Sequence, residues 1–246
     1  MHIIISNYSK NSLALIQWVK KKQLENVTVC YIDTGWSAEG WLEYVAAAEE
    51  FSRQRGFHVQ HLKSRVTFQD LMDIKRGFPS QKHQWCSLHL KGITLLQWLD
   101  EVDPECRATL LMAKRNSENS TEKPIPEFIE ESEYHGGRRV WHPLFNHDEA
   151  QRNQLLSNIN GITPPVFVGE CTPCINSSNA ELSRLSEVDI CKTEELEEDL
   201  GVSMFNSLNG KNSGGIRIII QQAKENADDK KRPFKYGCSS EFGCGS

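Results

Sequence analysis

The sequence predicts an α/β protein built on a doubly wound, mostly parallel five-stranded sheet, followed by a helical region that carries cysteines. Short runs of β-branched residues alternate with longer amphipathic stretches, as strands alternate with helices around a parallel sheet. Polar loops follow the first, second and fourth runs, so these loops should meet at the carboxyl edge of the sheet. The 246 residues suit one α/β domain with a small appendage.

The first part of the chain supplies three of the predicted strands. Residues 3–5 form an apolar run that ends in a polar loop, and an amphipathic helix closed by three lysines follows that loop. Residues 27–32 are a second β-branched run, and a helix is predicted over residues 39–55. The third strand is predicted over residues 57–62.

The remaining strands precede a change in the character of the chain. Residues 107–112 and 140–145 are the fourth and fifth predicted strands, and a helix is predicted over residues 148–159. A double proline soon after this helix marks a boundary, beyond which acidic helical stretches and a glycine-rich tail follow. We therefore expect a nucleotide-binding α/β domain over residues 1–160 and a helical C-terminal region over residues 161–246.

Charge and cysteine content narrow the class of protein. The net charge of −5 argues against nucleic-acid binding through bulk charge, and short basic clusters such as Arg138-Arg139 are interpreted as solvated surface. The N-terminal apolar run is too short for a signal peptide or a membrane span, so a cytoplasmic protein is expected. Because the cytoplasm is reducing, the eight cysteines are expected to be metal ligands or thiols, not disulfides.

Four of these cysteines form two close pairs in the C-terminal region. Cys171 and Cys174 have the spacing that lets two sulfurs bind one metal from a tight turn, and Cys238 and Cys244 lie in the glycine-rich tail. Zinc and a 4Fe–4S cluster both accept four thiolates, so the spacing leaves the metal open. A second possible set of ligands combines Cys86 with Cys171, Cys174 and one tail cysteine.

Candidate nucleotide-binding residues follow the first two predicted strands. The loop after the first strand opens a helix, where main-chain N–H groups and the helix dipole favour phosphate oxygens. Asp33, Thr34 and Gly35 end the second strand, where a carboxylate can meet a ribose or a metal ion. The candidate residues of the loop are Asn7, Tyr8, Ser9, Lys10, Asn11 and Ser12.

Three further side chains join Lys10 as candidates for catalysis. Cys86 lies at the start of a predicted helix, where the pKa of a thiol can be lowered, and Lys91, about one turn later, is predicted to bind phosphate. Arg115 follows the fourth strand, where a guanidinium can bind phosphate or sulfate with two hydrogen bonds. The structural alternatives are a buried thiol at Cys86 and a surface ion pair between Arg115 and Glu118.

Taken in order along the chain, these motifs resemble those of the PAPS reductase-like branch of the adenine nucleotide α-hydrolase superfamily, also called PP-loop ATP pyrophosphatases. The family loop S-[GF]-G-K-D-S is similar to residues 7–12, and the family D-T-G is matched by residues 33–35. The chain departs from the loop pattern at Ser9, where the family has glycine, and at Asn11, where it has aspartate.

Three other segments carry the same resemblance. Trp85-Cys86 with Lys91 looks like the family's substrate segment W-C-x-x-x-x-K, and residues 113–119 are similar to its G-x-R-x-x-E-S loop. Cys171-Thr172-Pro173-Cys174, with the paired tail cysteines, looks like the members that carry an iron–sulfur cluster. The resemblance extends over nearly the whole chain.

The resemblance implies an ATP pyrophosphatase similar to the corresponding component of DNA phosphorothioation systems, using ATP and Mg²⁺. Such an enzyme adenylates an oxygen of its acceptor, releases pyrophosphate and lets sulfur displace AMP; the implied acceptor is DNA or tRNA. The implied metal centre is a 4Fe–4S cluster, with zinc as the alternative. The implied partners are a cysteine desulfurase as sulfur donor and a nucleic acid or a protein bound to one. A second copy of the chain is a further candidate partner, and no membrane is expected.

Two alternatives stay open. The chain resembles PAPS and APS reductases, but its tail lacks the E-C-G-x-H segment that carries their catalytic cysteine. A nucleotide-binding module without hydrolysis, with a structural zinc ion, is the second alternative, and the altered loop suits it.

Overall fold

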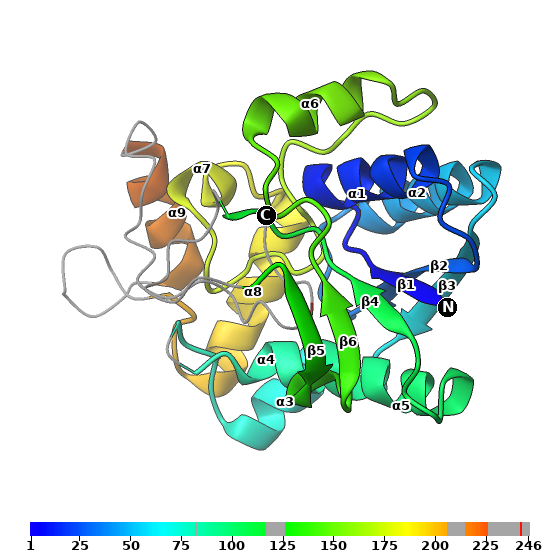
Figure 1. Ribbon diagram of the computed structural model, residues 1–246. Coiled ribbons are helices and arrows are strands. Elements are labelled where there is room, and N and C mark those ends of the chain that lie inside the picture. Colours follow the sequence, from blue (N-terminus) through cyan, green and yellow to red (C-terminus); the bar gives the residue numbers. More distant parts are fainter. Residues whose placement is uncertain (82, 117–125, 206–214, 226–241, 243–246) are drawn as a thin grey trace.

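A twisted sheet lies between two layers of helices, and a third group of helices lies beyond one end of the sheet (Figure 1). The computed structural model describes residues 1–81, 83–116, 126–205, 215–225 and 242. The elements are β1 (His2–Ile5), α1 (Lys10–Lys21), β2 (Val27–Asp33), α2 (Trp41–Gln54), β3 (His58–Lys63), α3 (Phe68–Lys75), α4 (Trp85–Ser87), η1 (Leu88–Gly92), α5 (Ile93–Val102), β4 (Thr109–Leu111), β5 (Phe128–Ser132), η3 (Glu133–His135), β6 (Arg138–Trp141), α6 (Glu149–Ser157), α7 (Asn179–Leu182), α8 (Glu187–Leu200) and α9 (Gly215–Glu225).

The sheet has six strands in the order β3-β2-β1-β4-β6-β5, so the prediction of five strands was wrong by one. All neighbouring strands are parallel except the edge strand β5, which is antiparallel to β6. The missed strand has the sequence Phe-Ile-Glu-Glu-Ser and is exposed at three of its five positions, so it lacks the apolar run of a buried parallel strand. The predicted doubly wound, mostly parallel fold class is confirmed.

Alternate residues of the buried strands pack on opposite faces of the sheet. Ile4 faces a cluster that includes residues of α1 and α2, and Ile3 and Ile5 face a cluster with Leu95 and Leu99 of α5. Figure 1 shows α1 and α2 above the sheet and α5 below it. Short connections lead from β1, β2 and β3 to α1, α2 and α3, whereas β4 is followed along the chain by β5.

Phe242, at the far end of the chain, also belongs to the cluster on the α5 side. Its ring is 2% exposed and packs between Gly92 and the rings of Tyr134 and His135. A Cβ atom at position 92 would lie only 2.7 Å from the ring of Phe242. Glycine at position 92 is therefore required by this close approach.

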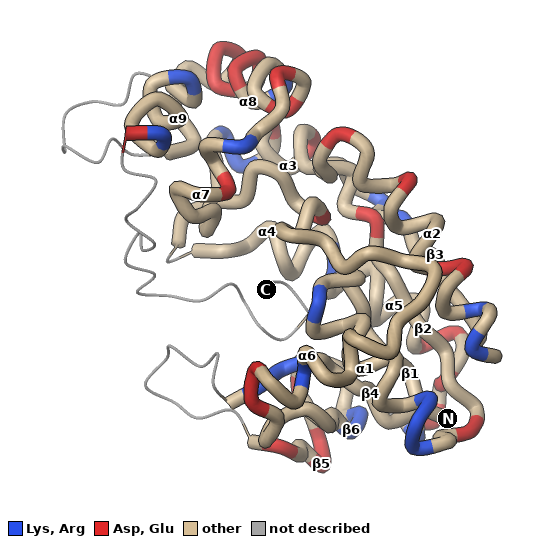
Figure 2. The backbone as a smooth tube through the Cα atoms, turned by 90° about the horizontal axis from the view of Figure 1, so that it is seen from above, with Lys and Arg blue, Asp and Glu red and all other residues tan. Residues whose placement is uncertain are grey.

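The helices that follow residue 161 share a third hydrophobic cluster with earlier segments. Leu182, Ile190 and Ile219 pack with Trp36 and with residues of α3 in this cluster. Acidic residues gather on α8 (Figure 2), so this part of the surface repels the phosphates of a nucleic acid. Among the described residues, none of the helices has both the length and the apolar character needed to cross a bilayer. The division of the chain at residue 160 stays a prediction.

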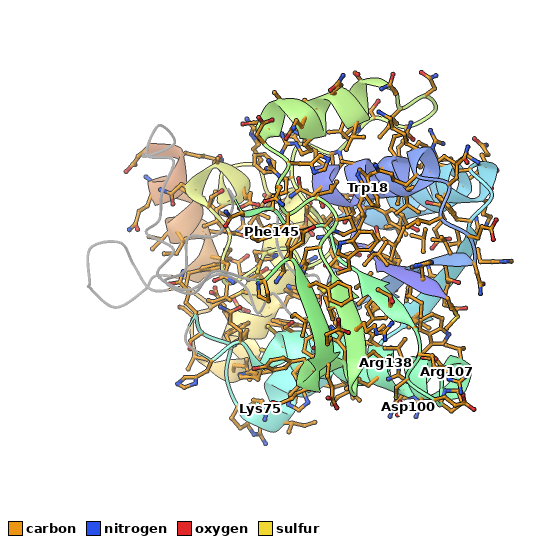
Figure 3. The ribbon with its side chains drawn as sticks, viewed as in Figure 1. Trp18, Lys75, Asp100, Arg107, Arg138 and Phe145 are labelled. Atoms are coloured by element: carbon orange, nitrogen blue, oxygen red, sulfur yellow. The ribbon has the colours of Figure 1, made fainter. Side chains whose placement is uncertain are left out.

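Arg138, at the start of β6, is fully buried, so its interpretation as solvated surface was wrong. Its guanidinium donates to Asp103 Oδ2 at 2.9 Å and to the main-chain oxygens of Leu99 and Asp103 at 3.0 and 2.7 Å. These oxygens lie at the end of α5, where helix carbonyls lack partners within the helix. Figure 3 shows Arg138 beside the end of α5. Arg138 thereby fastens α5 to the sheet.

Burial of Asp103 raises the pKa of its carboxyl, but hydrogen bonds outweigh that effect and hold the pKa below its ordinary value. The donors are the main-chain N–H groups of Ala108 and Arg107 and the guanidinium of Arg138. Asp103 therefore stays ionised and balances the charge of Arg138.

We expect Arg138→Met to lower the free energy of unfolding by about 3–5 kcal/mol, because it leaves the buried Asp103 carboxylate without its counter-charge. Urea unfolding followed by circular dichroism measures this loss. The matched control is Arg139→Met, since the Arg139 side chain is 59% exposed and lies 3.5 Å from Glu130. The control should change the free energy by less than about 0.5 kcal/mol. Equal losses in the two variants would contradict the role of Arg138.

Candidate functional site

The loop between β1 and α1 is held in shape by hydrogen bonds among its own side chains. Oδ1 of Asn7 accepts from the main-chain N–H of Ser9 at 3.1 Å and from the Ser12 hydroxyl at 2.9 Å. The Ser9 hydroxyl caps α1 by accepting from the N–H of Ser12, and the Ser6 hydroxyl accepts from the N–H of Tyr8. A loop ordered in this way binds a ligand with a smaller loss of conformational freedom.

One polar atom of this loop, Nδ2 of Asn7, is buried and has no hydrogen-bond partner within the described part of the chain. The orientation of the amide follows from Oδ1, which receives two donors. An unsatisfied buried donor costs about 1–3 kcal/mol, so this N–H group calls for an acceptor. It lies just before the N-terminus of α1, which favours anions. A phosphate oxygen is an acceptor of suitable charge.

Tyr8 contributes its main chain to the loop and its ring to the core. The residue has a φ of 52°, in the left-handed region, and its side chain is fully buried. Its ring stacks on Tyr31 with centroids 5.7 Å apart, and its carbonyl accepts a hydrogen bond from the Tyr44 hydroxyl at 2.9 Å. Burial raises the pKa of the Tyr8 phenol above its ordinary value, so the phenol stays neutral. The ring of Tyr8 therefore belongs to the hydrophobic cluster that also contains Tyr31.

The turn after β2 forms hydrogen bonds both within itself and with the C-terminal region. Oδ1 of Asp33 accepts from the N–H of Gly35 at 2.9 Å, which holds the carboxylate at the strand end. The Thr34 hydroxyl is fully buried and donates to the main-chain oxygen of Glu170 at 2.8 Å. The sulfur of Cys171 lies 3.5 Å from that hydroxyl. The predicted D-T-G motif is thus in direct contact with the first cysteine of the C-terminal region.

Residues 169–173 run alongside the segment that follows β2. Ala38 N–H donates to Gly169 O at 2.7 Å, and Thr172 N–H donates to Trp36 O at 2.8 Å. The indole N–H of Trp36 also donates to the Pro173 oxygen at 3.1 Å. Gly169 is required at this place because a Cβ atom would lie 2.7 Å from the ring of Trp41. The close approach brings the cysteine pair to the carboxyl edge of the sheet.

Cys86 lines a pocket together with Cys171 and Cys174. The pocket is partly open to solvent, and its room for water-sized molecules amounts to about 30 Å³. All three cysteines are partly exposed and unbridged. The other residues that line the pocket are Thr34, Trp36, Phe68, Pro79, Ser87, Leu90, Lys91, Pro173, Ile175 and Met204.

Lys91 is buried and forms an ion pair with Glu170. Its Nζ lies 2.8 and 2.9 Å from the two carboxylate oxygens, and the two side chains are only 2% and 4% exposed. The ammonium that was predicted to bind phosphate is therefore occupied by a carboxylate of the same chain.

The other predicted catalytic side chains lie around the loop at the strand ends. Lys10 is partly exposed at the first position of α1, and Arg115 is 6% exposed in the segment after β4. Because β1 lies between β2 and β4 in the sheet, these segments and the turn after β2 share one edge. Glu118, the predicted partner of Arg115, lies outside the described residues. Asn11 is buried in the first turn of α1.

The predicted metal ligands are only partly described. Cys171 and Cys174 lie in the turn beside the pocket, and the N–H of Asn176 donates to the sulfur of Cys174 at 3.5 Å. Cys238 and Cys244 lie outside the described residues. Within the described ranges, no group of three or more His, Cys, Asp or Glu side chains is arranged closely enough to hold a metal ion. The second predicted set, with Cys86, has its three described members around one pocket.

Three residues of the site were missed by the sequence analysis. Glu170 pairs with Lys91, Trp36 connects the D-T-G turn to the cysteine pair, and Tyr44 holds the main chain of Tyr8. The position of Glu170 directly before the cysteine pair was the one usable signal. The other two look like ordinary core aromatics in sequence.

The strand order, the loop between β1 and α1 and the D-T-G turn define a doubly wound α/β protein whose candidate site lies at the carboxyl ends of its parallel strands. Residues 2–167 match the phosphoadenosine phosphosulfate reductase domain family, and the chain belongs to this family. The predicted family is confirmed by this match.

Several solved structures are similar to this chain at low sequence identity. The phosphate complex of PAPS reductase from Candida auris is 16% identical, with a TM-score of 0.45 over 63% of this chain and 71% of that one. NMN synthetase from Francisella tularensis is 12% identical, with a TM-score of 0.47 over 94% and 86%. The U34-tRNA thiolase NcsA from Methanococcus maripaludis, with its [4Fe-4S] cluster, is 17% identical, with a TM-score of 0.43 over 100% and 76%. No curated protein matches the chain.

We expect Tyr44→Phe to lower the free energy of unfolding by about 0.5–1.5 kcal/mol, because the carbonyl of Tyr8 loses its hydrogen bond. Urea unfolding measures the loss, and hydrogen exchange should show faster opening of the loop between β1 and α1. Tyr134→Phe is the control, since Tyr134 is 58% exposed. Similar exchange rates for the loop in both variants would show that Tyr44 does not hold it.

Proposed function

We propose that this chain is an ATP pyrophosphatase that adenylates an acceptor so that sulfur can replace an oxygen. The observation that carries the proposal is the 3.5 Å contact between the sulfur of Cys171 and the hydroxyl of Thr34 in the D-T-G turn. This contact joins a nucleotide-type strand end to a pocket lined by three thiols. An adenylated acceptor held at the strand ends would therefore lie next to sulfur nucleophiles.

The proposed nucleotide site is the loop between β1 and α1 together with Asp33. The unpaired Nδ2 of Asn7 and the N-terminus of α1 supply donors for phosphate oxygens. Lys10 and Arg115 would stabilise charge on the triphosphate, and Asp33 would contact the ribose or Mg²⁺. An acceptor oxygen attacks the α-phosphorus, and the bond to the β-phosphate oxygen breaks, which releases pyrophosphate.

The thiols of the pocket would carry out the second half of the reaction. A persulfide on Cys86, formed by a cysteine desulfurase, attacks the activated acceptor, and AMP leaves with its oxygen. Cys171 or Cys174 then attacks the sulfur of Cys86, which frees the acceptor sulfur and forms a protein disulfide. A cellular thiol reduces that disulfide and restores the pocket. Cys86 thus acts as the sulfur carrier in this scheme.

In an alternative scheme the cysteine pair of the turn holds a soft metal centre instead, since thiolates are the ligands of iron–sulfur clusters and of structural zinc. Cys171 and Cys174 would hold it with Cys238 and Cys244. Cys86 is left out of this set because no three described His, Cys, Asp or Glu side chains lie close enough to share a metal ion. A 4Fe–4S cluster would supply an alternative place to hold the incoming sulfur. The proposed acceptor is DNA or tRNA, brought by itself or by a protein bound to it. A homodimer is part of the same proposal.

We expect the reduced, anaerobic protein to release pyrophosphate from ATP in the presence of Mg²⁺ and a nucleic-acid acceptor. Asn7→Ala should lower the rate by about 10- to 100-fold, since it removes a hydrogen bond to a charged oxygen. Asp33→Ala should also lower it. Asn146→Ala is the matched control, because that exposed amide bonds only to Glu127 among the described residues.

Two other outcomes would favour the alternatives. Tight binding of ATP without pyrophosphate release would sink the proposal in favour of a nucleotide-binding module. Formation of sulfite from PAPS with thioredoxin would instead assign the chain to the sulfonucleotide reductases. This alternative is compatible with its family membership.

We expect anaerobically purified protein to absorb broadly near about 400 nm, which a cluster produces and zinc does not. Cys171→Ser should remove most of this absorbance, because it deletes one thiolate ligand, and Cys86→Ser should keep it. Cys106→Ser is the control, since Cys106 is an exposed thiol outside the pocket. A colourless protein with one zinc per chain would establish the alternative metal, and loss of the absorbance in Cys86→Ser would assign Cys86 to the ligand set.

A further inference from the structure

The buried ion pair between Lys91 and Glu170 connects the two segments that carry the thiols of the pocket. We propose that this pair is a positioning device that fixes the separation between Cys86 and the Cys171–Cys174 turn. The inference rests on the proposed function, which gives the pocket its role in sulfur transfer. The separation between the thiols is measured without nucleotide or metal.

Glu170 joins three parts of the fold. Its main-chain oxygen accepts from the hydroxyl of Thr34 at the end of β2, and its carboxylate pairs with Lys91 on the helix that carries Cys86. The next residue along the chain is Cys171. The position of Cys171 is therefore defined relative to the sheet by one bond and relative to the Cys86 helix by the other.

The helix is shaped so that Lys91 reaches this carboxylate. Between α4 and α5 the chain makes a π-turn, η1, in which the N–H of Ile93 donates to the oxygen of Leu88. In an α-helix, residues five apart differ in direction by about 140°, and the wider turn of a π segment between them reduces this angle. Lys91 follows Cys86 by five residues, and both side chains line the pocket. The π-turn thus brings the ammonium towards the face that carries the thiol.

The ion pair is an expensive way to join two segments, which argues against an incidental contact. Each charge must leave water, and the attraction between them offsets that loss only where the geometry is good and both oxygens are engaged. Apolar side chains of similar size would join the segments at least as stably. What a charge-assisted pair adds is a short, defined distance between the helix and the turn. Thiols that exchange sulfur need such a defined separation.

The test measures the distance between the thiols. Reduced, metal-free full-length protein is treated with dibromobimane, which joins two nearby thiols, and the products are identified by mass spectrometry after proteolysis. Two products are compared: the link from Cys86 to Cys171 or Cys174, and the link between Cys171 and Cys174. The second product is an internal standard, so the ratio of the first to the second reports the separation between Cys86 and the turn.

In the double variant Lys91→Met/Glu170→Met, no buried charge is left without a partner, so the protein is expected to fold with a urea midpoint near that of the wild type. The cross-link ratio should fall by about tenfold, since small misplacements of reacting groups have large effects on rate. The control is Arg107→Met/Glu105→Met, which removes an exposed ion pair and should leave the ratio unchanged. A ratio within about twofold of the wild type in the folded Lys91/Glu170 variant would overturn the proposal.

Glu170→Gln is a second, smaller change, because the amide oxygen can still accept a hydrogen bond from Lys91 while the charge is lost. A cross-link ratio between those of the wild type and the double variant would support the positioning role. A ratio equal to that of the wild type, with the double variant also unchanged, would overturn it. The cross-linking experiment contains no ATP. Its result therefore does not depend on whether the protein has pyrophosphatase activity.

Discussion

The arrangement of the site depends on the hydrogen bonds that hold residues 169–173 against the segment after β2. The main-chain bonds of Ala38 to Gly169 and of Thr172 to Trp36 resemble the pairing of two short strands outside the sheet. They fix a connection between parts of the chain that are more than a hundred residues apart in sequence, and the Thr34 hydroxyl and the Trp36 indole strengthen it. The ion pair of Lys91 with Glu170 and the packing of Cys171 and Ile175 in the cluster around Trp36 add to this connection.

The loop between β1 and α1, the proposed phosphate-binding turn, obtains its shape from side chains. Glycines commonly supply the required main-chain angles in such loops, whereas here Tyr8 adopts the left-handed conformation at a cost of about 1–2 kcal/mol. The stacking of its ring on Tyr31 and the bond from Tyr44 offset that cost. Asn7 and two serines then provide the bonds that shape the turn. The result is a loop that is stiff where a glycine-rich loop is adaptable.

The features that the sequence predicted well are those that repeat with a simple period. The parallel strands are short apolar runs, so four of them were placed within a few residues, and β6 was predicted about two to four residues too late. The edge strand β5 has no such run and escaped notice. The D-T-G turn and the position of Cys86 on a helix were predicted from local motifs. The sequence analysis gave two possible sets of metal ligands, and one of them placed Cys86 beside Cys171 and Cys174, with which it lines the pocket.

The features that the sequence did not predict depend on long-range contacts between charged groups. Lys91 looks like a free phosphate-binding lysine because nothing near it in sequence indicates Glu170. Arg138 looks like half of a surface doublet, and only the position of the α5 end explains why it is buried while Arg139 is exposed. Ion pairs of this kind have no periodicity, so burial decides their character, and burial is a property of the whole fold.

The contact between Gly92 and Phe242 has a consequence for how this protein can vary in evolution. The two positions share one volume in the core: a side chain at 92 and an aromatic ring at 242 exclude each other. A residue with a Cβ atom at 92 becomes acceptable only if 242 becomes small, and the reverse change demands glycine. The two positions should therefore covary in homologous chains, because residue 242 packs on the helix that carries Lys91.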